Sequence, residues 1–289
     1  MSVHADARGG AGRALRRAPT HALIFVLCAV WLVPTLGLAI SSIRPANEIA
    51  TSGWWRSMRL PFRFTLDNYR DVLDARNLGT SLLNSLLITI PATVVPIIVA
   101  AFAAYAIARM PFRGSGLAFT VIVGLLVVPI QATLVPVLRM LNRFDLTGTF
   151  VGIWLVHLGF TLPFAVYLLR NFFATLPAEL FEAARIDGAT ELQMFFRLAL
   201  PLSRPAVASL AIFQFLWVWN DLLSALIFLG GTESVAPVTL VLSNLVSSRG
   251  EGWQTVTAAA FVSMLLPMTV FLALQRHFVN GLLSGATKG

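Results

Sequence analysis

Long runs of apolar residues, separated by short charged segments, dominate the chain. Six runs carry no Asp, Glu, Lys or Arg, apart from Asp221 in the fifth. A transmembrane helix needs about 20 consecutive apolar residues, so each run is long enough to cross a bilayer. The pattern therefore predicts an all-α membrane protein with six transmembrane helices, over residues 21–43, 77–108, 114–138, 146–169, 205–231 and 252–275.

The composition agrees with this class. Of 289 residues, 57% are hydrophobic and 12% are charged, against about 25% charged in a soluble domain. The first run is longer than the core of a signal peptide, which has about 7–15 residues, so we expect it to stay as a span. We divide the chain into a flexible tail over 1–20, a membrane domain over 21–278 and a C-terminal tail over 279–289.

The arginines and lysines set the expected orientation. Six spans place both termini on one side. If that side is cytoplasmic, twelve basic residues lie inside and nine outside, and four of the twelve precede the first run. Cytoplasmic loops carry the excess of basic residues, and the first flank usually weighs most. We therefore predict a multi-pass protein of the cytoplasmic membrane with both termini in the cytoplasm.

A polar segment over residues 177–205, here called the central segment, lies between the fourth and fifth runs. Glu179 and Glu182 fall in the opening turns of a predicted helix over 178–186 and Arg185 lies near its end, the arrangement that a helix dipole favours. Leu180, Phe181 and Ala184 share one face at helical spacing, opposite these charges.

The same segment contains a stop and a restart. Asp187-Gly188 is predicted to end the first helix, because Gly adopts the left-handed conformation without a side-chain clash. Thr190 with Gln193 forms a capping-box pattern, which predicts a second helix. Two short helices around a turn, with a charged face and small alanines, are typical of a projection that docks on another subunit.

These residues carry a family resemblance. The string Glu182-Ala183-Ala184, Asp187-Gly188-Ala189, Phe195 and Leu200-Pro201 resembles the EAA loop of the membrane-spanning permease subunits of binding-protein-dependent ATP-binding-cassette (ABC) importers. Further segments, taken in chain order, resemble the carbohydrate-uptake, maltose permease-like branch of that family. These segments are residues 64–69, Asn84-Ser85, Tyr105-Ala106 with Arg109 and Phe112, and residues 281–289.

The resemblance implies a permease subunit of an ATP-driven importer, which moves a sugar such as an oligosaccharide or glycoside across the cytoplasmic membrane by alternating access. In that family a short coupling helix, located here in the central segment between spans 4 and 5, docks on the ATPase subunit. The residues implied in this coupling are Glu182, Ala183, Ala184, Asp187, Gly188, Ala189 and Phe195.

The implied partners are a second permease subunit, an ABC ATPase dimer, an extracellular substrate-binding protein, the sugar and the lipid bilayer, with no nucleic acid. The chain has no G-x-x-x-x-G-K-[ST] phosphate loop, so we expect a transport subunit that is not an enzyme. It is expected to hold no cofactor of its own, and ATP and Mg are expected on the partner ATPase subunits.

Polar residues inside the predicted spans have two interpretations. Asn84, Gln131, Gln214, Trp217 and Asn220 are candidates for the translocation path, because amides bind hydroxyl groups and indole rings stack on sugars. Hydrogen bonding between helices is the default for such amides. For the tryptophans and for Asn220-Asp221, the favoured interpretation is an interfacial belt at the outer mouth of the fifth span.

Other functions stay open at this stage. Within transport, the solute can be a polyol, a glycerol phosphate or an amino acid. A passive channel would need no ATPase. A membrane-embedded enzyme would need paired carboxylates at the membrane surface, for which Asp67, Asp71 and Asp74 are the nearest set. A single cysteine, Cys28, and scattered histidines predict no metal site.

Overall fold

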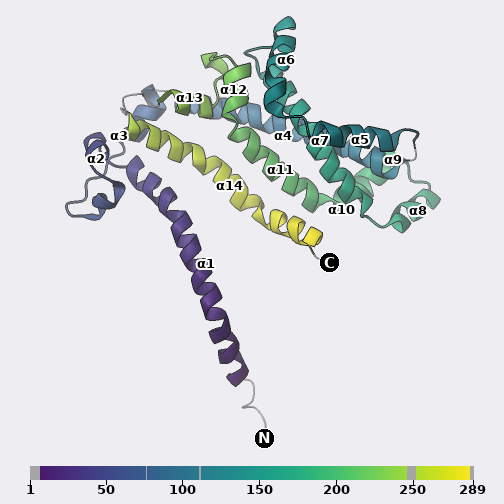
Figure 1. Cartoon of the computed structure of the whole chain (residues 1–289), viewed down its shortest axis with the longest axis horizontal. Helices are drawn as coiled ribbons and strands as arrows, with labels where there is room; N and C mark the ends of the chain where they lie inside the picture. The colour runs from purple at the N-terminus through teal and green to yellow at the C-terminus, as the bar shows by residue number, and fades with distance from the viewer. Residues whose placement is uncertain (1–6, 76, 111, 246–251, 287–289) are drawn as a thin grey trace. The chain divides into compact units, whose positions relative to one another are not determined.

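A computed structural model describes residues 7–75, 77–110, 112–245 and 252–286 (Figure 1). Regular structure in these residues is helical throughout, with no strand, as the sequence predicts. The chain divides into two compact units, Met1–Arg76 with Val246–Phe261, and Asn77–Leu245 with Val262–Gly289. The last helix, α14 (Trp253–Ala286), runs through the boundary between them.

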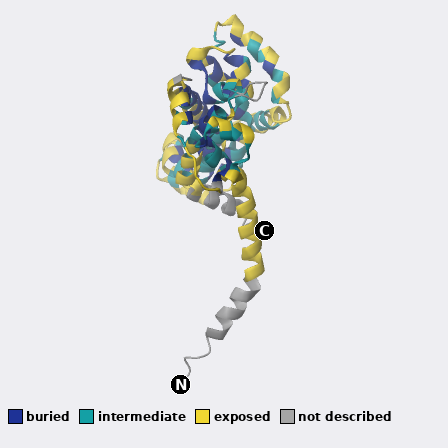
Figure 2. Cartoon of the chain, turned by 90° about the vertical axis from the view of Figure 1, so that its left-hand side faces the viewer, coloured by how far each residue is buried: buried dark blue, intermediate teal, exposed yellow. Residues whose placement is uncertain are grey.

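Unit 1 begins with a long apolar helix and a compact polar segment. Its elements are α1 (Ala7–Ser42), α2 (Ala46–Thr51), η1 (Trp54–Met58), α3 (Asp67–Arg70) and η2 (Asp71–Ala75). Helix α1 is exposed along most of its apolar length (Figure 2), which suits a helix that faces lipid or another subunit. The sequence predicts a flexible tail over 1–20, whereas the structure continues the first helix back to Ala7.

The end of α1 is fastened by residues of the 64–69 motif. The buried Asn68 side chain donates from Nδ2 to the main-chain oxygens of Ser42, at 2.9 Å, and Arg44, at 2.8 Å. Tyr69 shares a 2.6 Å hydrogen bond between its hydroxyl and that of Ser42. Carbonyl groups at a helix end lack partners within the helix, so this motif caps α1.

Unit 2 is a bundle built around one helix. Its elements are α4 (Leu78–Arg109), α5 (Ser115–Leu125), α6 (Ile130–Arg143), α7 (Phe150–Ala174), α8 (Ala178–Ile186), α9 (Glu191–Met194), η3 (Phe195–Ala199), α10 (Leu200–Leu202), α11 (Arg204–Trp219), α12 (Leu222–Phe228), η4 (Glu233–Val235) and α13 (Val238–Leu245). Helix α4 packs chiefly against α7 and α11. Buried alanines on α4, among them Ala100, Ala101 and Ala104, allow the close helix approach that small residues provide in membranes.

Among the described residues, four helical segments are long and apolar enough to cross a membrane: Ala18–Ser42, Leu78–Arg109, Phe150–Ala174 and Trp253–Gln275. Two further candidates are bent pairs, Ser115–Leu125 with Ile130–Arg143, at 100°, and Glu191–Leu202 with Arg204–Trp219, at 73°. The count rises to six if each pair is one span.

The predicted spans over 114–138 and 205–231 are each interrupted helices in the structure. The first breaks ahead of Pro129, because proline lacks an N–H and disfavours helical backbone in the preceding residue. The second breaks after Trp219. There the Asp221 carboxylate accepts a 3.0 Å hydrogen bond from the Ser224 amide and caps the new helix α12.

Candidate functional site

The central segment folds as the sequence predicts. Helix α8 spans Ala178–Ile186, the predicted bounds. Asp187 is its C-cap, and Gly188 has a φ of +78°. A Cβ at Gly188 would meet no atom within 4 Å, so backbone conformation, and not crowding, requires glycine there. The capping box of Thr190 and Gln193 is confirmed at the start of α9.

Phe181 anchors α8 to the rest of unit 2. Its side chain is 2% exposed and belongs to the core cluster formed by α4, α7 and α11. The Arg109 guanidinium carbon lies 4.5 Å from the centre of the Phe181 ring, within the range of a cation–π contact. Tyr105 packs against the same ring, with the ring centres 6.4 Å apart. One aromatic side chain therefore fixes the inner face of α8.

Arg109 also joins α8 to the end of α7. Its Nε donates to the main-chain oxygen of Phe173 at 2.9 Å, and its Nη2 donates to the main-chain oxygen of Leu176. These carbonyls belong to the last turn of α7 and the residues after it, where oxygens lack partners within the helix. The end of α4, the end of α7 and the buried face of α8 thus meet at one arginine.

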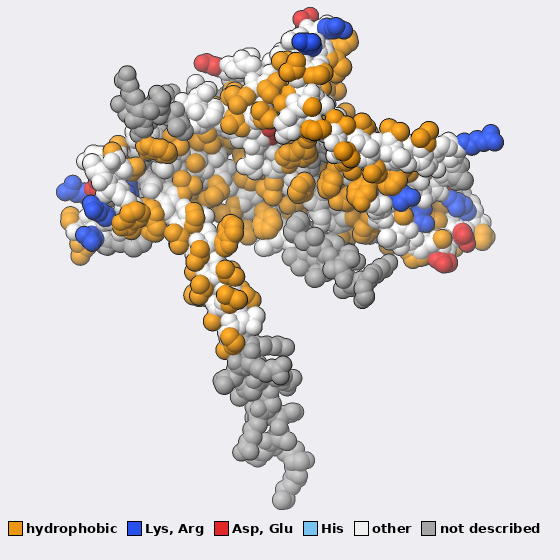
Figure 3. Space-filling model, viewed as in Figure 1, with side chains coloured by type: hydrophobic (Ala, Val, Ile, Leu, Met, Phe, Trp, Pro, Cys, Tyr) orange, Lys and Arg blue, Asp and Glu red, His pale blue; other side chains and the backbone are white. Residues whose placement is uncertain are grey.

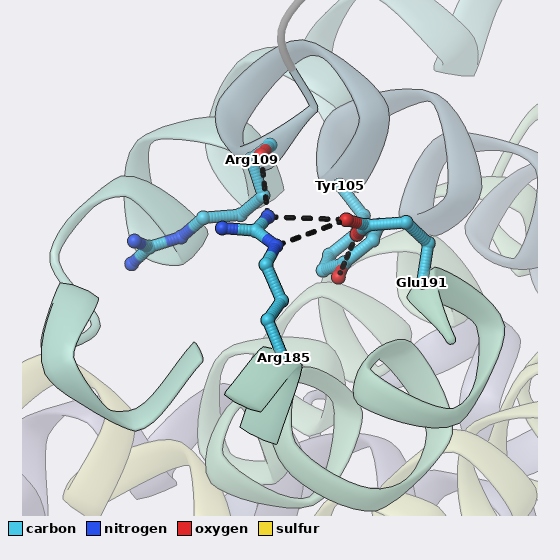
Figure 4. Close-up of polar contacts among 4 residues, drawn as sticks. All are labelled: Tyr105, Arg109, Arg185 and Glu191. Carbon is cyan, nitrogen blue, oxygen red and sulfur yellow. Dashed lines mark hydrogen bonds and ion pairs between the residues drawn. The ribbon is translucent and has the colours of Figure 1, made fainter. Parts of the chain in front are cut away.

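A second polar connection joins α4, α8 and α9 (Figure 4). The Tyr105 hydroxyl donates to Glu191 Oε2 at 2.9 Å. Arg185 Nη2 lies 3.1 Å from Glu191 Oε1 and donates at 3.4 Å to the main-chain oxygen of Arg109. Both charged side chains are partly exposed, so the ion pair itself contributes at most about 1 kcal/mol. Its role is to orient α8 against the start of α9.

The outer face of α8 carries acidic and small residues. Glu179, Glu182, Ala183 and Asp187 are exposed, and Ile186 is 86% exposed. None of the three acids forms an ion pair within the part of the chain that the structure describes. An exposed isoleucine surrounded by unpaired carboxylates is a surface that complements an apolar socket with a basic rim.

The remaining predicted coupling residues take different positions. Ala184 and Ala189 are half-buried against the core cluster. Phe195 is 3% exposed, and its ring stacks on Phe102 with the centres 4.6 Å apart. Phe195 therefore holds the central segment to α4 and presents no surface to another protein. Sequence reasoning did not single out Tyr105, Arg109 and Glu191 as a group, because their contacts join positions far apart in the sequence.

The five candidates for the translocation path do not gather in one place. Asn84 is buried and donates to the main-chain oxygens of Ser234, at 3.0 Å, and Ala236, at 3.2 Å. Gln214 is buried and donates to Thr161 Oγ1 at 2.6 Å. These two amides join elements of unit 2 to one another, as the default interpretation for such residues expects.

The other three candidates are more accessible. Gln131 is exposed on α6, and Asn220 is exposed and donates to the Leu216 oxygen of its own helix at 2.7 Å. Trp217 lines an apolar cavity of about 310 Å³ beside Phe160, Phe164 and Phe213. Trp217 is therefore the candidate whose surroundings leave most room for a ligand. No group of three or more potential metal-ligating residues lies together within the described ranges.

Known proteins with similar sequences cover almost the whole chain. Residues 81–283 match the family described as "Binding-protein-dependent transport system inner membrane component". The chain is 52% identical over 276 residues to the osmoprotective compounds uptake permease protein GgtD of Synechocystis sp., covering 94% of this chain and 93% of the relative. It is 39% identical to the alpha-glucoside transport system permease protein AglG of Rhizobium meliloti, covering 95% and 99%.

A solved structure has the same fold. It belongs to a bacterial ABC transporter involved in the import of the acidic polysaccharide alginate. The match has a TM-score of 0.74 at 23% identity and covers 96% of this chain and 99% of that chain.

Proposed function

The chain belongs to the family of binding-protein-dependent transport system inner membrane components, and we propose that it is a permease subunit of an ATP-driven importer for a sugar. Family membership makes the chain a membrane transport subunit and not an enzyme. The single observation that carries the specific proposal is the anchored helix α8, which has a buried aromatic on one side and, on the other, exposed acids that form no ion pair with the described residues.

The sugar is supported by the names of relatives. AglG, a relative over nearly the full length, is named for alpha-glucoside transport, so we propose an oligosaccharide or glycoside as the solute. GgtD is named for the uptake of osmoprotective compounds, and small osmoprotective solutes are the second candidate class. The Trp217 cavity, with its aromatic wall, offers flat apolar faces of the kind on which sugar rings stack.

Coupling follows from the position of α8. We propose that its outer face seats in an ATPase subunit, with Glu182 towards basic residues of that subunit and Ala183 allowing close approach. Phe181 and Arg109 fasten α8 to the ends of α4 and α7. A displacement of α8 by nucleotide-driven closure of the ATPase dimer would therefore tilt these helices together, which is the movement that alternating access requires.

The proposed assembly follows the family. We propose six spans, counting each bent pair once, with α8 and both termini in the cytoplasm and the coupling loop between spans 4 and 5. A second permease subunit completes the pathway, and ATP and Mg are bound by the ATPase dimer. A substrate-binding protein delivers the solute from outside; a solved alginate transporter of the same fold has been described in complex with such a periplasmic protein.

The test is ATP hydrolysis by the assembled complex with its binding protein, measured across a panel of glycosides and osmoprotective solutes. We expect stimulation by one glycoside class and uptake of that solute into vesicles. Stimulation by osmoprotective compounds alone would select the second candidate class. If no solute of either class stimulated ATP hydrolysis or was taken up, the proposed function would be contradicted.

A further inference from the structure

Unit 1 contains a cavity that the proposed transport mechanism does not use. It has a volume of about 210 Å³ and lies beside α2 and η1, just after the end of α1. Arg44, Arg56, Arg59 and Arg63 line it together with Glu48 and Ser52. Basic side chains gather over this segment in Figure 3. We call this cavity the arginine pocket.

The arginine pocket concentrates positive charge that the described residues do not neutralise. Four guanidinium groups face one carboxylate, that of Glu48. None of the four arginines forms an ion pair within the described ranges. Arg56, Arg59 and Arg63 are exposed, so water and salt screen their mutual repulsion, and an anion at the centre would be attracted by all four guanidinium groups.

Arg44 makes the imbalance sharper. Its side chain is 1% exposed. Its Nη atoms donate to the main-chain oxygens of Ser52 and Glu48, each at 3.0 Å, and to the Ser52 hydroxyl. Its Nε has no hydrogen-bond partner among the described residues. These acceptors are all neutral, and a buried charge with no counter-charge is unfavourable. Glu48 is the one carboxylate that lines the pocket, and it forms no ion pair with Arg44 among the described residues.

The surroundings of the pocket indicate a membrane surface. A Cβ on Gly37 would lie 2.8 Å from Trp54 Nε1, so η1 packs back against α1 within the candidate span Ala18–Ser42. Ser42, the last residue of the candidate span, lies five positions after Gly37, so η1 packs about 7.5 Å along the axis from the end of that span. Trp55, Leu60, Phe62 and Phe64 are all more than half exposed, and aromatic residues alternating with arginines favour the boundary between headgroups and acyl chains.

We propose that the arginine pocket binds the phosphate of an anionic phospholipid headgroup. Guanidinium groups bind phosphate oxygens through paired, charge-assisted hydrogen bonds. The exposed aromatic side chains would then contact the acyl chains of the same lipid. An acidic surface of a soluble partner would satisfy the arginines and leave these apolar side chains in water.

The experiment uses the full chain in its assembled complex, in nanodiscs of phosphatidylcholine mixed with phosphatidylglycerol. Native mass spectrometry after gentle release measures which lipid each complex retains. The wild type should retain phosphatidylglycerol in preference to phosphatidylcholine. The double variant Arg56→Gln with Arg59→Gln should lose this preference by roughly fivefold for each arginine removed. The double variant Arg56→Lys with Arg59→Lys keeps the charge and should retain part of the preference for phosphatidylglycerol.

A matched control removes the same charge elsewhere. Arg139 and Arg143 are exposed on α6 in unit 2, and changing both to Gln should leave the lipid preference unchanged. Equal preference in the wild type and in the Arg56/Arg59 variant overturns the proposal. Inorganic phosphate is the second probe, and full displacement of phosphatidylglycerol by phosphate would assign the pocket to a free anion instead. If the Arg56/Arg59 variant docked the binding protein more weakly but kept its lipid preference, the proposal would also be overturned.

Discussion

Two sets of polar side chains in unit 2 have opposite surroundings. On the outer face of α8, Glu182 and Asp187 are exposed and form no ion pair with the described residues. Inside the bundle, Asn84 and Gln214 are buried and hydrogen-bonded to other elements of the same unit. The comparison separates polar groups that are available to another molecule from those that hold the bundle together, although both sets lie near membrane-spanning helices.

The difference assigns the two sets to different tasks. A buried amide that bonds two backbone oxygens has no donor left for a passing solute. An exposed carboxylate that forms no ion pair with the described residues can still pair with a basic side chain of another protein. We therefore expect substitutions on α8 to affect subunit assembly and coupling, and substitutions in the interior to affect stability. The comparison would fail if α8 variants lost stability with normal assembly, or if interior variants lost assembly with normal stability.

The largest effect is expected from the aromatic side chain that fastens α8. Phe181→Ala removes a ring that is 2% exposed, and such truncations cost about 3–5 kcal/mol. Helix α8 should detach, so that the ATPase subunit no longer co-purifies and uptake is lost. Phe144→Ala is the control, because Phe144 lies outside α8 and is 69% exposed, and it should leave ATPase binding unchanged. Retained ATPase binding in Phe181→Ala would show that the anchor is dispensable.

A smaller loss is expected in the interior. Asn84→Ala leaves the oxygens of Ser234 and Ala236 without their donor, which costs about 1–3 kcal/mol when such groups are buried. Thermal unfolding should show this loss, while the solute concentration for half-maximal uptake stays unchanged. Asn220→Ala, at an exposed helix end, should change stability little. A changed solute affinity with normal stability would place Asn84 in the translocation path.

The smallest effect on stability is expected at the turn after α8. Gly188→Ala places a side chain at a φ of +78°, which costs about 1–2 kcal/mol. Because open space surrounds the site, the strain should be relieved by reorienting α8. Transport should therefore fall more than protein yield. Gly159→Ala, on α7 and also in open space, is the control and should leave both quantities near wild type.

The local parts of this account were readable from the sequence. The bounds of α8, the Gly188 turn and the Thr190–Gln193 capping box depend on residues within a few positions of one another, and local propensity determines them. The resemblance in residues 182–201 then indicated the family. Composition and run length were sufficient to predict an all-helical membrane protein.

The remaining features depend on tertiary contacts. Arg109 meets Phe173 across 64 residues and Tyr105 meets Glu191 across 86, and no periodicity reports such pairs. The break at Asp221 was missed because hydropathy treats one acid in an apolar run as a tolerated exception, whereas the carboxylate caps a new helix there. Exposure of an amide such as Asn84 or Asn220 likewise cannot be derived from its neighbours in sequence.

The central claim is that the outer face of α8 touches the ATPase. Cys28 is the one cysteine in the chain, so Cys28→Ser gives a background in which Ala183→Cys, on the exposed face of α8, can be cross-linked in the assembled transporter. Ala132→Cys on α6, also exposed, is the control; Figure 1 places α6 and α8 in separate parts of unit 2. We predict a cross-link from position 183 to the ATPase subunit, changed in yield by ATP, and none from position 132. A complex that transports its solute, yet gives no ATPase cross-link from position 183 in any nucleotide state, would contradict the account.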